Sequence, residues 1–220
     1  KFYQASSSEM FGDVLHKTQN EKTPFNPQSP YAISKLFGHY ITINYRNSYN
    51  LFTVSGILFN HESPLRGEEF VTRKIVKGLV EIINNKRNFL ELGNLDAKRD
   101  WGFAKEYVEA MWKMMQKKIP EDYIICTGRT YSIKEFINYC IDYLKIDSKW
   151  IGKGLNTKLI NKKTNKVIIK VNPKYFRPSE VNYLKGDFTK AKKEINWKPK
   201  ISLKELVEIM LKDEIKYYNK

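Results

Sequence analysis

Apolar and polar positions alternate along the first two thirds of the chain in a pattern that predicts strands and helices in turn. Short runs rich in β-branched and aromatic residues predict strands, and longer runs with an apolar residue every three or four positions predict helices. We expect strands at residues 2–5, 51–59, 89–92 and 123–127, and helices at 31–49, 69–84, 104–117 and 132–144. Because strands that alternate with helices usually form a parallel sheet with crossover helices, the pattern predicts an α/β fold.

The last third of the chain follows a different pattern. Residues 149–174 are rich in lysine and contain a short apolar run at 167–169, which predicts a small hairpin or excursion. Two closing helices are expected at 188–195 and 202–218.

Individual helices carry marks of their own. Two serine and glutamate pairs have the spacing of a capping box, in which each side chain bonds a backbone amide at the start of a helix; they are Ser132 with Glu135 and Ser202 with Glu205. The helix expected at 31–49 takes its apolar stripe from Leu36, Phe37, Tyr40, Ile41 and Ile43.

Composition favours a folded protein without a membrane span. The chain has 220 residues, of which 41% are hydrophobic, and this is enough for one large core or two smaller ones. No run approaches the ~18 apolar residues of a transmembrane helix, and residues 1–3 do not begin a signal segment. Cys126 and Cys140 are too few for a disulfide framework or a cysteine metal site. We therefore expect a cytoplasmic protein with buried cysteines, no metal and no membrane partner.

Positive charge is the one unusual feature of the composition. The 39 lysines and arginines exceed the 24 acidic residues by 15, which suits a nucleic acid or a substrate that carries phosphates. Only seven of the 39 are arginine, the residue that base-reading surfaces favour for its bidentate fork. The lysines are spread along the chain and interleaved with acids, as on a solvated surface. A basic nucleic-acid-binding module is therefore the weaker alternative, and we expect no nucleic acid partner.

Tyr31 and Lys35 are the strongest candidates for chemistry. Residues four apart lie on one face of a helix, so the lysine ammonium can approach the tyrosine phenol. A nearby cation favours the deprotonated phenolate, which suits a general base. A pair with this spacing is also common by chance.

A second group of polar residues follows the strand expected at 2–5. Ser6, Ser7, Ser8 and Glu9 stand at its carboxyl end, where open α/β sheets bind their ligands. The serines could instead cap a turn and leave the glutamate in solvent. With the tyrosine and lysine pair on the next helix, the two segments are expected to converge on one crevice.

Several motifs that span nearly the whole chain resemble those of a known family. They are Ser-Ser-Glu-Met-Phe-Gly at 7–12, Ser-Pro-Tyr-Ala-Ile-Ser-Lys at 29–35, Asn-His-Glu-Ser-Pro at 60–64, Arg-Asp-Trp-Gly at 99–102 and Tyr-Phe-Arg-Pro-Ser-Glu-Val at 175–181. By these motifs the chain resembles the extended short-chain dehydrogenase/reductase enzymes that act on nucleotide sugars. Within them it is most similar to the GDP-mannose 4,6-dehydratases. The resemblance implies an NADP-dependent lyase that converts GDP-mannose into GDP-4-keto-6-deoxymannose.

The same resemblance implies a role for each residue of the crevice. Tyr31, held as phenolate by Lys35, would take the proton of the C4 hydroxyl of the hexose. Glu9 would remove the C5 proton and help the C6 hydroxyl leave, a step that epimerases of the same fold do not need. Ser7, where the family usually has threonine, would hydrogen-bond the C4 oxygen. Another nucleotide-sugar dehydratase or epimerase, or an inactive homologue that serves assembly, is the alternative.

The resemblance also implies which residues bind the two ligands. The expected contacts to NADP are Tyr31, Lys35, His61 and Arg66. The expected contacts to the GDP-sugar are Asn60, Lys74, Arg99, Arg177 and Glu180, since charge-assisted bonds to phosphate are strong. For His61 the alternative is a structural role at a strand end. For Arg177 and Glu180 the alternative is a structural ion pair between the two. The chain departs from the family pattern at Leu65, which replaces an arginine, and at Phe103, which replaces a histidine.

Members of this family begin with a glycine-rich turn that cradles the dinucleotide pyrophosphate. The Gly152-Lys153-Gly154 run lacks the third glycine of that fingerprint and follows the tyrosine motif instead of preceding it. We therefore expect the C-terminal portion of an extended short-chain dehydrogenase/reductase: part of a Rossmann-type parallel sheet with a smaller mixed α/β substrate domain. Residues 1–60 should complete the NADP-binding domain. Residues 61–220 should form mainly the substrate domain, with about 89–127 returning to the sheet. Such a fragment should be inactive alone, and the intact enzyme should be a homodimer or homotetramer.

Overall fold

The structure, a computed structural model, describes residues 1–13, 17–176, 181 and 183–218. Contacts group the chain into two compact units. Unit 1 is made of Lys1–His61, Lys98–Tyr131 and Val181–Ser202, and unit 2 is made of Glu62–Ala97, Ser132–Glu180 and Leu203–Lys220. Each unit is therefore assembled from segments that lie far apart in the sequence.

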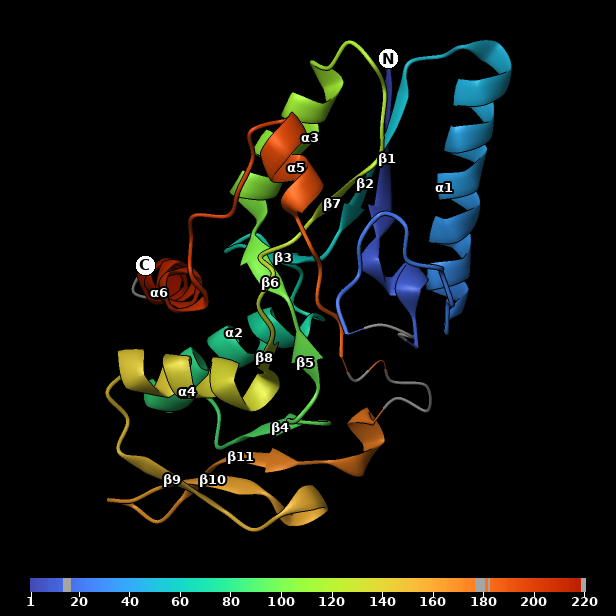
Figure 1. Ribbon diagram of the computed structural model, residues 1–220. Helices are drawn as coiled ribbons and strands as arrows, with labels where there is room; N and C mark the ends of the chain where they lie inside the picture. Colours follow the sequence, from blue (N-terminus) through green and yellow to red (C-terminus); the bar gives the residue numbers. More distant parts are fainter. Residues whose placement is uncertain (14–16, 177–180, 182, 219–220) are drawn as a thin grey trace. The chain divides into compact units, whose positions relative to one another are not determined.

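Unit 1 is built on a three-stranded parallel sheet in the order β1-β2-β7 (Figure 1). Its strands are β1 (Phe2–Ser7), β2 (Thr53–Leu58) and β7 (Tyr123–Ile125). One face of the sheet is covered by α1 (Pro30–Tyr49), and the other by α3 (Ala104–Met115) with α5 (Thr189–Glu194) against β7. The short strands pair two by two, β3 (Asn60–Glu62) with β6 (Trp101–Phe103) and β5 (Lys98–Arg99) with β8 (Tyr131–Ser132). Parallel strands joined by helices confirm the α/β prediction.

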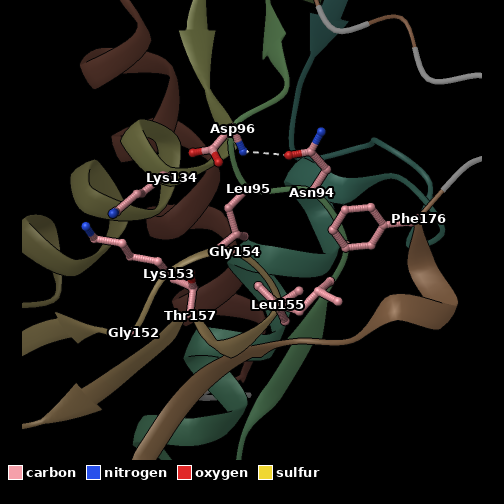
Figure 2. Close-up of a pocket in the computed structure, with 12 residues that line it drawn as sticks. Asn94, Leu95, Asp96, Lys134, Gly152, Lys153, Gly154, Leu155, Thr157 and Phe176 are labelled. Atoms are coloured by element: carbon pink, nitrogen blue, oxygen red, sulfur yellow. Dashed lines mark hydrogen bonds between the residues drawn. The ribbon is translucent and has the colours of Figure 1, made fainter.

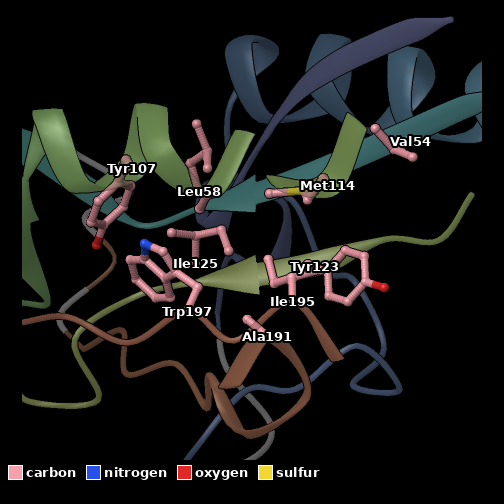
Figure 3. Close-up of a cluster of buried hydrophobic side chains, with 10 residues drawn as sticks. Val54, Leu58, Tyr107, Met114, Tyr123, Ile125, Ala191, Ile195 and Trp197 are labelled. Carbon is pink, nitrogen blue, oxygen red and sulfur yellow. The ribbon is translucent and has the colours of Figure 1, made fainter. Parts of the chain in front are cut away.

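A buried hydrophobic cluster holds β2, β7 and α3 together (Figure 3). Its members from the sheet and α3 are Val54, Leu58, Tyr123, Ile125, Tyr107, Ala110 and Met114, and the returning segment adds Ala191, Ile195 and Trp197. Trp197 is almost fully buried, and its Nε1 donates a hydrogen bond of 2.8 Å to the Glu106 carbonyl oxygen. The indole is thus packed and hydrogen-bonded at once, as buried tryptophans require.

The helix α1 begins and ends close to where its sequence predicts. Ser29 Oγ accepts a hydrogen bond from the Ala32 amide, and Pro30 takes the first helical position, where the missing N–H costs nothing. Asn50 ends the helix in the left-handed conformation with φ of 52°.

The predicted apolar stripe of α1 is only partly buried. Phe37 is 69% exposed and Tyr40 and Ile41 are also exposed, whereas α1 buries Ala32, His39 and Thr42. The reason is that α1 approaches β1 through small and polar residues. At Gly38 an added Cβ would lie only 2.7 Å from the Gln4 Nε2. Leu36 and Ile43 of the stripe are partly buried, and Leu36 packs against a buried cluster of unit 1.

Unit 2 combines three helices with a four-stranded mixed sheet. The helices α2 (Val71–Ile83), α4 (Ile133–Tyr143) and α6 (Leu203–Tyr218) pack against one another, and an ion pair between Arg73 and the buried Glu214 joins α2 to α6. The sheet has the order β4-β11-β10-β9, from β4 (Leu90–Leu92), β11 (Val167–Val171), β10 (Lys158–Asn161) and β9 (Ser148–Ile151). Only the β4 and β11 pair is parallel.

Several details of the structure bear on the sequence predictions. The lysine-rich segment forms three strands and the 3-10 turns η2 (Gly154–Asn156) and η3 (Pro173–Tyr175), so the small hairpin was an incomplete prediction. The edge of β4 accepts β11, which a local pattern does not reveal. The capping box of Ser132 and Glu135 is confirmed at the start of α4. Both cysteines are buried and free, as predicted. In the described part of the chain, no helix is long and apolar enough to cross a membrane.

Candidate active site

A tight turn shapes the carboxyl end of β1. The strand passes at Ser7 into the 3-10 turn η1 (Ser8–Phe11), and Ser7 Oγ accepts a hydrogen bond of 3.2 Å from the Glu9 amide. Gly12 ends η1 with φ of 54°, and its amide donates to the Glu9 carbonyl oxygen at 3.1 Å. Met10 and Phe11 are buried and anchor the turn. Because the Ser7 oxygen accepts the Glu9 amide, its hydroxyl hydrogen is left to be donated elsewhere.

Three residues of α1 at four-residue intervals define the neighbouring side of this strand end. Lys35 Nζ donates a hydrogen bond of 3.0 Å to the Ala5 carbonyl oxygen, and it lies 5.6 Å from the centroid of the Tyr31 ring. Tyr31 itself is 54% exposed. One turn after the lysine, His39 Nδ1 and Ser6 Oγ share a buried hydrogen bond of 3.2 Å. The lysine therefore stands between the tyrosine ring and the end of β1.

Four functional groups gather on the packed elements β1, η1 and α1 of unit 1. They are an accessible phenol, an ammonium, a largely buried hydroxyl and a partly buried carboxylate, from Tyr31, Lys35, Ser7 and Glu9. A phenolate can accept a proton, a hydroxyl can donate to an oxygen, and a carboxylate can remove a further proton. The arrangement suits proton transfer at a carbon that carries oxygen.

The predicted ligand contact His61 is held firmly in unit 1. Its Nδ1 lies 2.8 Å from the Phe59 carbonyl oxygen, and its ring stacks on Tyr107 with centroids 4.9 Å apart. Asn60 precedes it on β3 and is half-buried. These contacts are what a structural histidine at a strand end would make, and they leave its role toward a cofactor a prediction.

The predicted cofactor contact Arg66 is held inside its own loop of unit 2. Its Nε lies 3.2 Å from a Glu62 carboxylate oxygen, and its guanidinium carbon lies 3.5 Å from the centroid of the Phe70 ring. Burial raises the pKa of Glu62, and the Arg66 charge and a hydrogen bond from Thr72 oppose that shift. One edge of the guanidinium is thus occupied by the loop. Leu65 is 94% exposed, so the position where the family has an arginine points into solvent.

Two predicted phosphate contacts stand in different units. Lys74, in unit 2, places its Nζ 3.9 Å from the centroid of the Tyr175 ring, and burial followed by the Arg87 charge lowers the lysine pKa. Arg99, in unit 1, donates to the Lys98 carbonyl oxygen at 2.9 Å. The remaining two candidates, Arg177 and Glu180, lie outside the described residues.

Asp100 is a buried carboxylate that sequence reasoning did not single out. Its oxygens accept from the Thr127 amide and hydroxyl at 2.8 and 2.6 Å, and from the Gly128 amide at 2.9 Å. Burial raises its pKa to about 6, although these bonds and one from the Gly186 amide act in the opposite direction. The side chain ties the β5 and β6 region to the segments after β7, which is a structural role.

A pocket in unit 2 also escaped prediction (Figure 2). It encloses about 380 Å³, and it is lined by residues of four segments: Gly93, Asn94, Leu95, Asp96, Lys134, Gly152, Lys153, Gly154, Leu155, Thr157, Val171 and Phe176. Asn94 Oδ1 accepts from the Asp96 amide at 3.0 Å, which shapes its rim. None of the predicted site residues lines it. Because its walls come from segments up to 83 positions apart, 93 to 176, no local motif could have marked it.

Comparison with known proteins gives two kinds of relatives. The chain is 50% identical over 220 residues to the GDP-mannose 4,6 dehydratase of Drosophila melanogaster, and the aligned region covers 100% of this chain and 56% of that protein. It is 50% identical over 215 residues to the GDP-mannose 4,6 dehydratase of Homo sapiens, and that aligned region covers 98% of this chain and 58% of that protein. The chain therefore spans little more than half the length of these relatives.

Solved structures with the same fold are more distant in sequence. RMD from Pseudomonas aeruginosa, solved in complex with NADPH, matches with a TM-score of 0.81 at 20% identity, over 98% of this chain and 66% of that one. The dTDP-glucose 4,6-dehydratase of Bacillus anthracis, solved in complex with NAD, matches with a TM-score of 0.80 at 20% identity, over 100% of this chain and 63% of that one. At this identity the likeness shows the fold alone. The family model described as GDP-mannose 4,6 dehydratase matches residues 1–210, and the chain is therefore a member of the GDP-mannose 4,6-dehydratase family.

Proposed function

We propose that this chain supplies the catalytic strand and helix of an enzyme that dehydrates GDP-mannose to GDP-4-keto-6-deoxymannose. The observation that carries the proposal is the bond from Lys35 Nζ to the Ala5 carbonyl oxygen, which sets the tyrosine and lysine pair beside the strand end of Ser7 and Glu9. Membership in the family and the names of its relatives support the substrate.

A nicotinamide cofactor fits one end of this site. Tyr31 is accessible and stands beside an ammonium, as a contact to a nicotinamide ribose requires, and Tyr31 and Lys35 would hold that end of the cofactor. When bound, the nicotinamide would accept a hydride from C4 and return one to C6. We assign NADP on the family resemblance, with His61 and Arg66 as further contacts. No described residue of the chain forms a glycine-rich pyrophosphate turn: Gly152 follows β9 and Gly154 begins η2, both in unit 2.

The four groups at the end of β1 divide the proton transfers among them. Tyr31, with Lys35 beside it, takes the proton of the C4 hydroxyl. Ser7 donates its hydroxyl hydrogen to the C4 oxygen, because the Glu9 amide already occupies its acceptor side. Glu9 removes the C5 proton, which the C4 ketone has made acidic, and passes a proton to the C6 hydroxyl as it leaves as water. A site for epimerisation needs no such carboxylate, so Glu9 favours the dehydratase.

The remaining parts of the proposal concern ligands and assembly. We propose that Asn60, Lys74, Arg99, Arg177 and Glu180 contact the phosphates and ribose of the GDP-sugar. The substrate domain would comprise mainly residues 61–220, and residues 1–60 would belong to the cofactor domain. We place the intact enzyme in the cytoplasm as a homodimer or homotetramer, and these assignments follow the family resemblance.

The proposal is tested by completing the enzyme. The chain is joined to the part of the Drosophila relative that it does not span, and GDP-mannose turnover with NADP is followed by mass spectrometry. We expect turnover, and we expect Tyr31→Phe to lower it by at least ~100-fold, as for loss of a general base. Tyr40→Phe on the same helix is the matched control, because Tyr40 also loses one exposed hydroxyl but lies outside the site. A folded joined protein without turnover, or a Tyr31→Phe variant as active as the control, would contradict the proposal.

A further inference from the structure

We infer that His39 is a positioning residue, which sets the spacing between Lys35 and the hydroxyl of Ser7 by holding the last residues of β1 against α1. The inference rests on the proposed function for the meaning of that spacing. It rests on contacts within unit 1 for everything else.

The last three residues of β1 are each held by a side-chain hydrogen bond. The Ala5 carbonyl oxygen accepts from Lys35 Nζ at 3.0 Å, Ser6 Oγ bonds His39 Nδ1 at 3.2 Å, and Ser7 Oγ accepts from the Glu9 amide at 3.2 Å. Two of these bonds reach α1, at Lys35 and His39, which are four positions and about one helical turn apart. Strand and helix are thus joined by side chains at two successive points, and both points limit how the end of β1 can shift against α1.

The imidazole of His39 is built into its place. It is 4% exposed, and its ring meets Phe25 edge to face with centroids 5.3 Å apart. Burial lowers the pKa of His39, which favours the neutral ring, although Asp122 acts in the opposite direction. A neutral imidazole in a fixed orientation can hold one hydroxyl without bringing a second charge beside the Lys35 ammonium.

The packing beside His39 makes the attachment stiff. Gly38 lets α1 approach β1 closely, since an added Cβ there would lie 2.7 Å from Gln4 Nε2. A buried Ser6 Oγ that lost its partner would be left unsatisfied, and such a loss is costly. Without the second attachment, the side chains of α1 would hold the last residues of β1 only through the Lys35 bond to the Ala5 carbonyl oxygen, beside the backbone pairing with β2. His39 therefore limits how far the end of β1 can move relative to the Lys35 ammonium.

The test uses two variants that break the same bond from opposite sides, His39→Leu and Ser6→Ala. In the full 220-residue chain, the rate at which an acylating reagent modifies Lys35 is measured by peptide mass spectrometry. We expect both variants to raise that rate several-fold, and we expect the double variant to add little, since the two residues act through one bond. Thr42→Val is the matched control: it removes a buried hydroxyl of α1 that bonds only the Gly38 carbonyl oxygen of the same helix.

Activity gives a second readout in the joined enzyme. We expect His39→Leu to lower kcat by up to about 100-fold, because small misplacements of catalytic groups have effects of that size. KM should stay nearly unchanged, and His39→Asn, whose amide can still reach Ser6, should recover much of kcat. If His39→Leu does not fold by circular dichroism, Ser6→Ala and His39→Asn carry the test. Equal Lys35 reactivity in the chain and in both bond-breaking variants would overturn the inference. An inactive joined enzyme would instead count against the proposed function, since the reactivity measurement does not need turnover.

Discussion

Gly12 ends the turn that carries Glu9, and replacing it should test whether that turn is as tightly packed as the structure indicates. Its φ of 54° is one that residues with a side chain rarely adopt, and an added Cβ would lie 1.8 Å from the Asn26 carbonyl oxygen. Gly154 has the same φ of 54°, but an added Cβ there meets nothing within 4 Å. Both alanine variants place a side chain at a positive φ, and only the variant at Gly12 adds a clash with the backbone.

The expected magnitudes follow from these two contributions. Backbone strain at a non-glycine residue costs about 1–3 kcal/mol, and overpacking adds about 1–3 kcal/mol. Gly12→Ala should lower the free energy of unfolding by about 2–6 kcal/mol, and Gly154→Ala by about 1–3 kcal/mol. In a protein of this size, the larger loss corresponds to a fall in Tm of roughly 4–24 °C.

Thermal unfolding followed by circular dichroism, with urea titration of the same samples, measures both variants. Asn26 cannot move aside freely, because its amide donates to the Met10 carbonyl oxygen at 3.0 Å. If Gly12→Ala is no less stable than Gly154→Ala, the close approach of the Asn26 backbone to η1 is absent in solution, and the placement of Glu9 argued above loses its support.

Three further predictions concern single residues. Glu9→Gln in the joined enzyme should still oxidise C4, seen as transient NADPH absorbance, but should release no dehydrated product; unchanged product formation would remove Glu9 from the mechanism. Because the Asp100 pKa is raised from 3.8 to about 6 in the folded state, its contribution to stability is present below pH ~4 and is lost as pH rises through about 6. Relative to Asp100→Asn, urea titrations should therefore show the wild type losing about 3 kcal/mol across that window, and parallel pH profiles would refute the assignment. Trp197→Ala should lower the free energy of unfolding by about 3–5 kcal/mol, since it empties a core site and orphans the Glu106 carbonyl acceptor, whereas a loss below 1 kcal/mol would show that the cluster of Figure 3 is not closed by this indole.

Local signals were enough to predict much of the fold. Ser29 and Pro30 mark the start of α1, and Ser132 with Glu135 marks the start of α4, because caps depend on residues within one turn of each other. The motifs around Tyr31 and Glu9 likewise identify the segments that meet at the end of β1. These motifs do not show how far apart the segments lie in space. Lys35 reaches Ala5, thirty positions earlier in the chain, because α1 packs closely against β1 at Gly38.

The features that escaped prediction all depend on partners distant in sequence. Phe37 is apolar by pattern yet exposed, because the face of α1 toward β1 is chosen by close approach and hydrogen bonds instead of hydrophobicity. Nothing near Asp100 in the sequence indicates that it is buried, because its hydrogen-bond partners Thr127 and Gly128 lie far along the chain. The hydrogen bond between Ser6 and His39 joins residues 33 positions apart, and no local pattern in the sequence indicates that these two side chains meet.

The interleaving of the two units has a consequence for how the protein is made. The core of unit 1 includes Trp197 and α5, which belong to the segment Val181–Ser202. Unit 2 includes α6, whose Glu214 forms the ion pair with Arg73. On the ribosome, a nascent chain that has emerged only as far as β7 can complete neither core. Unit 1 would therefore reach its native packing only after residues 181–202 have emerged, and unit 2 only after α6; until then their apolar surfaces are exposed to chaperones and to other nascent chains.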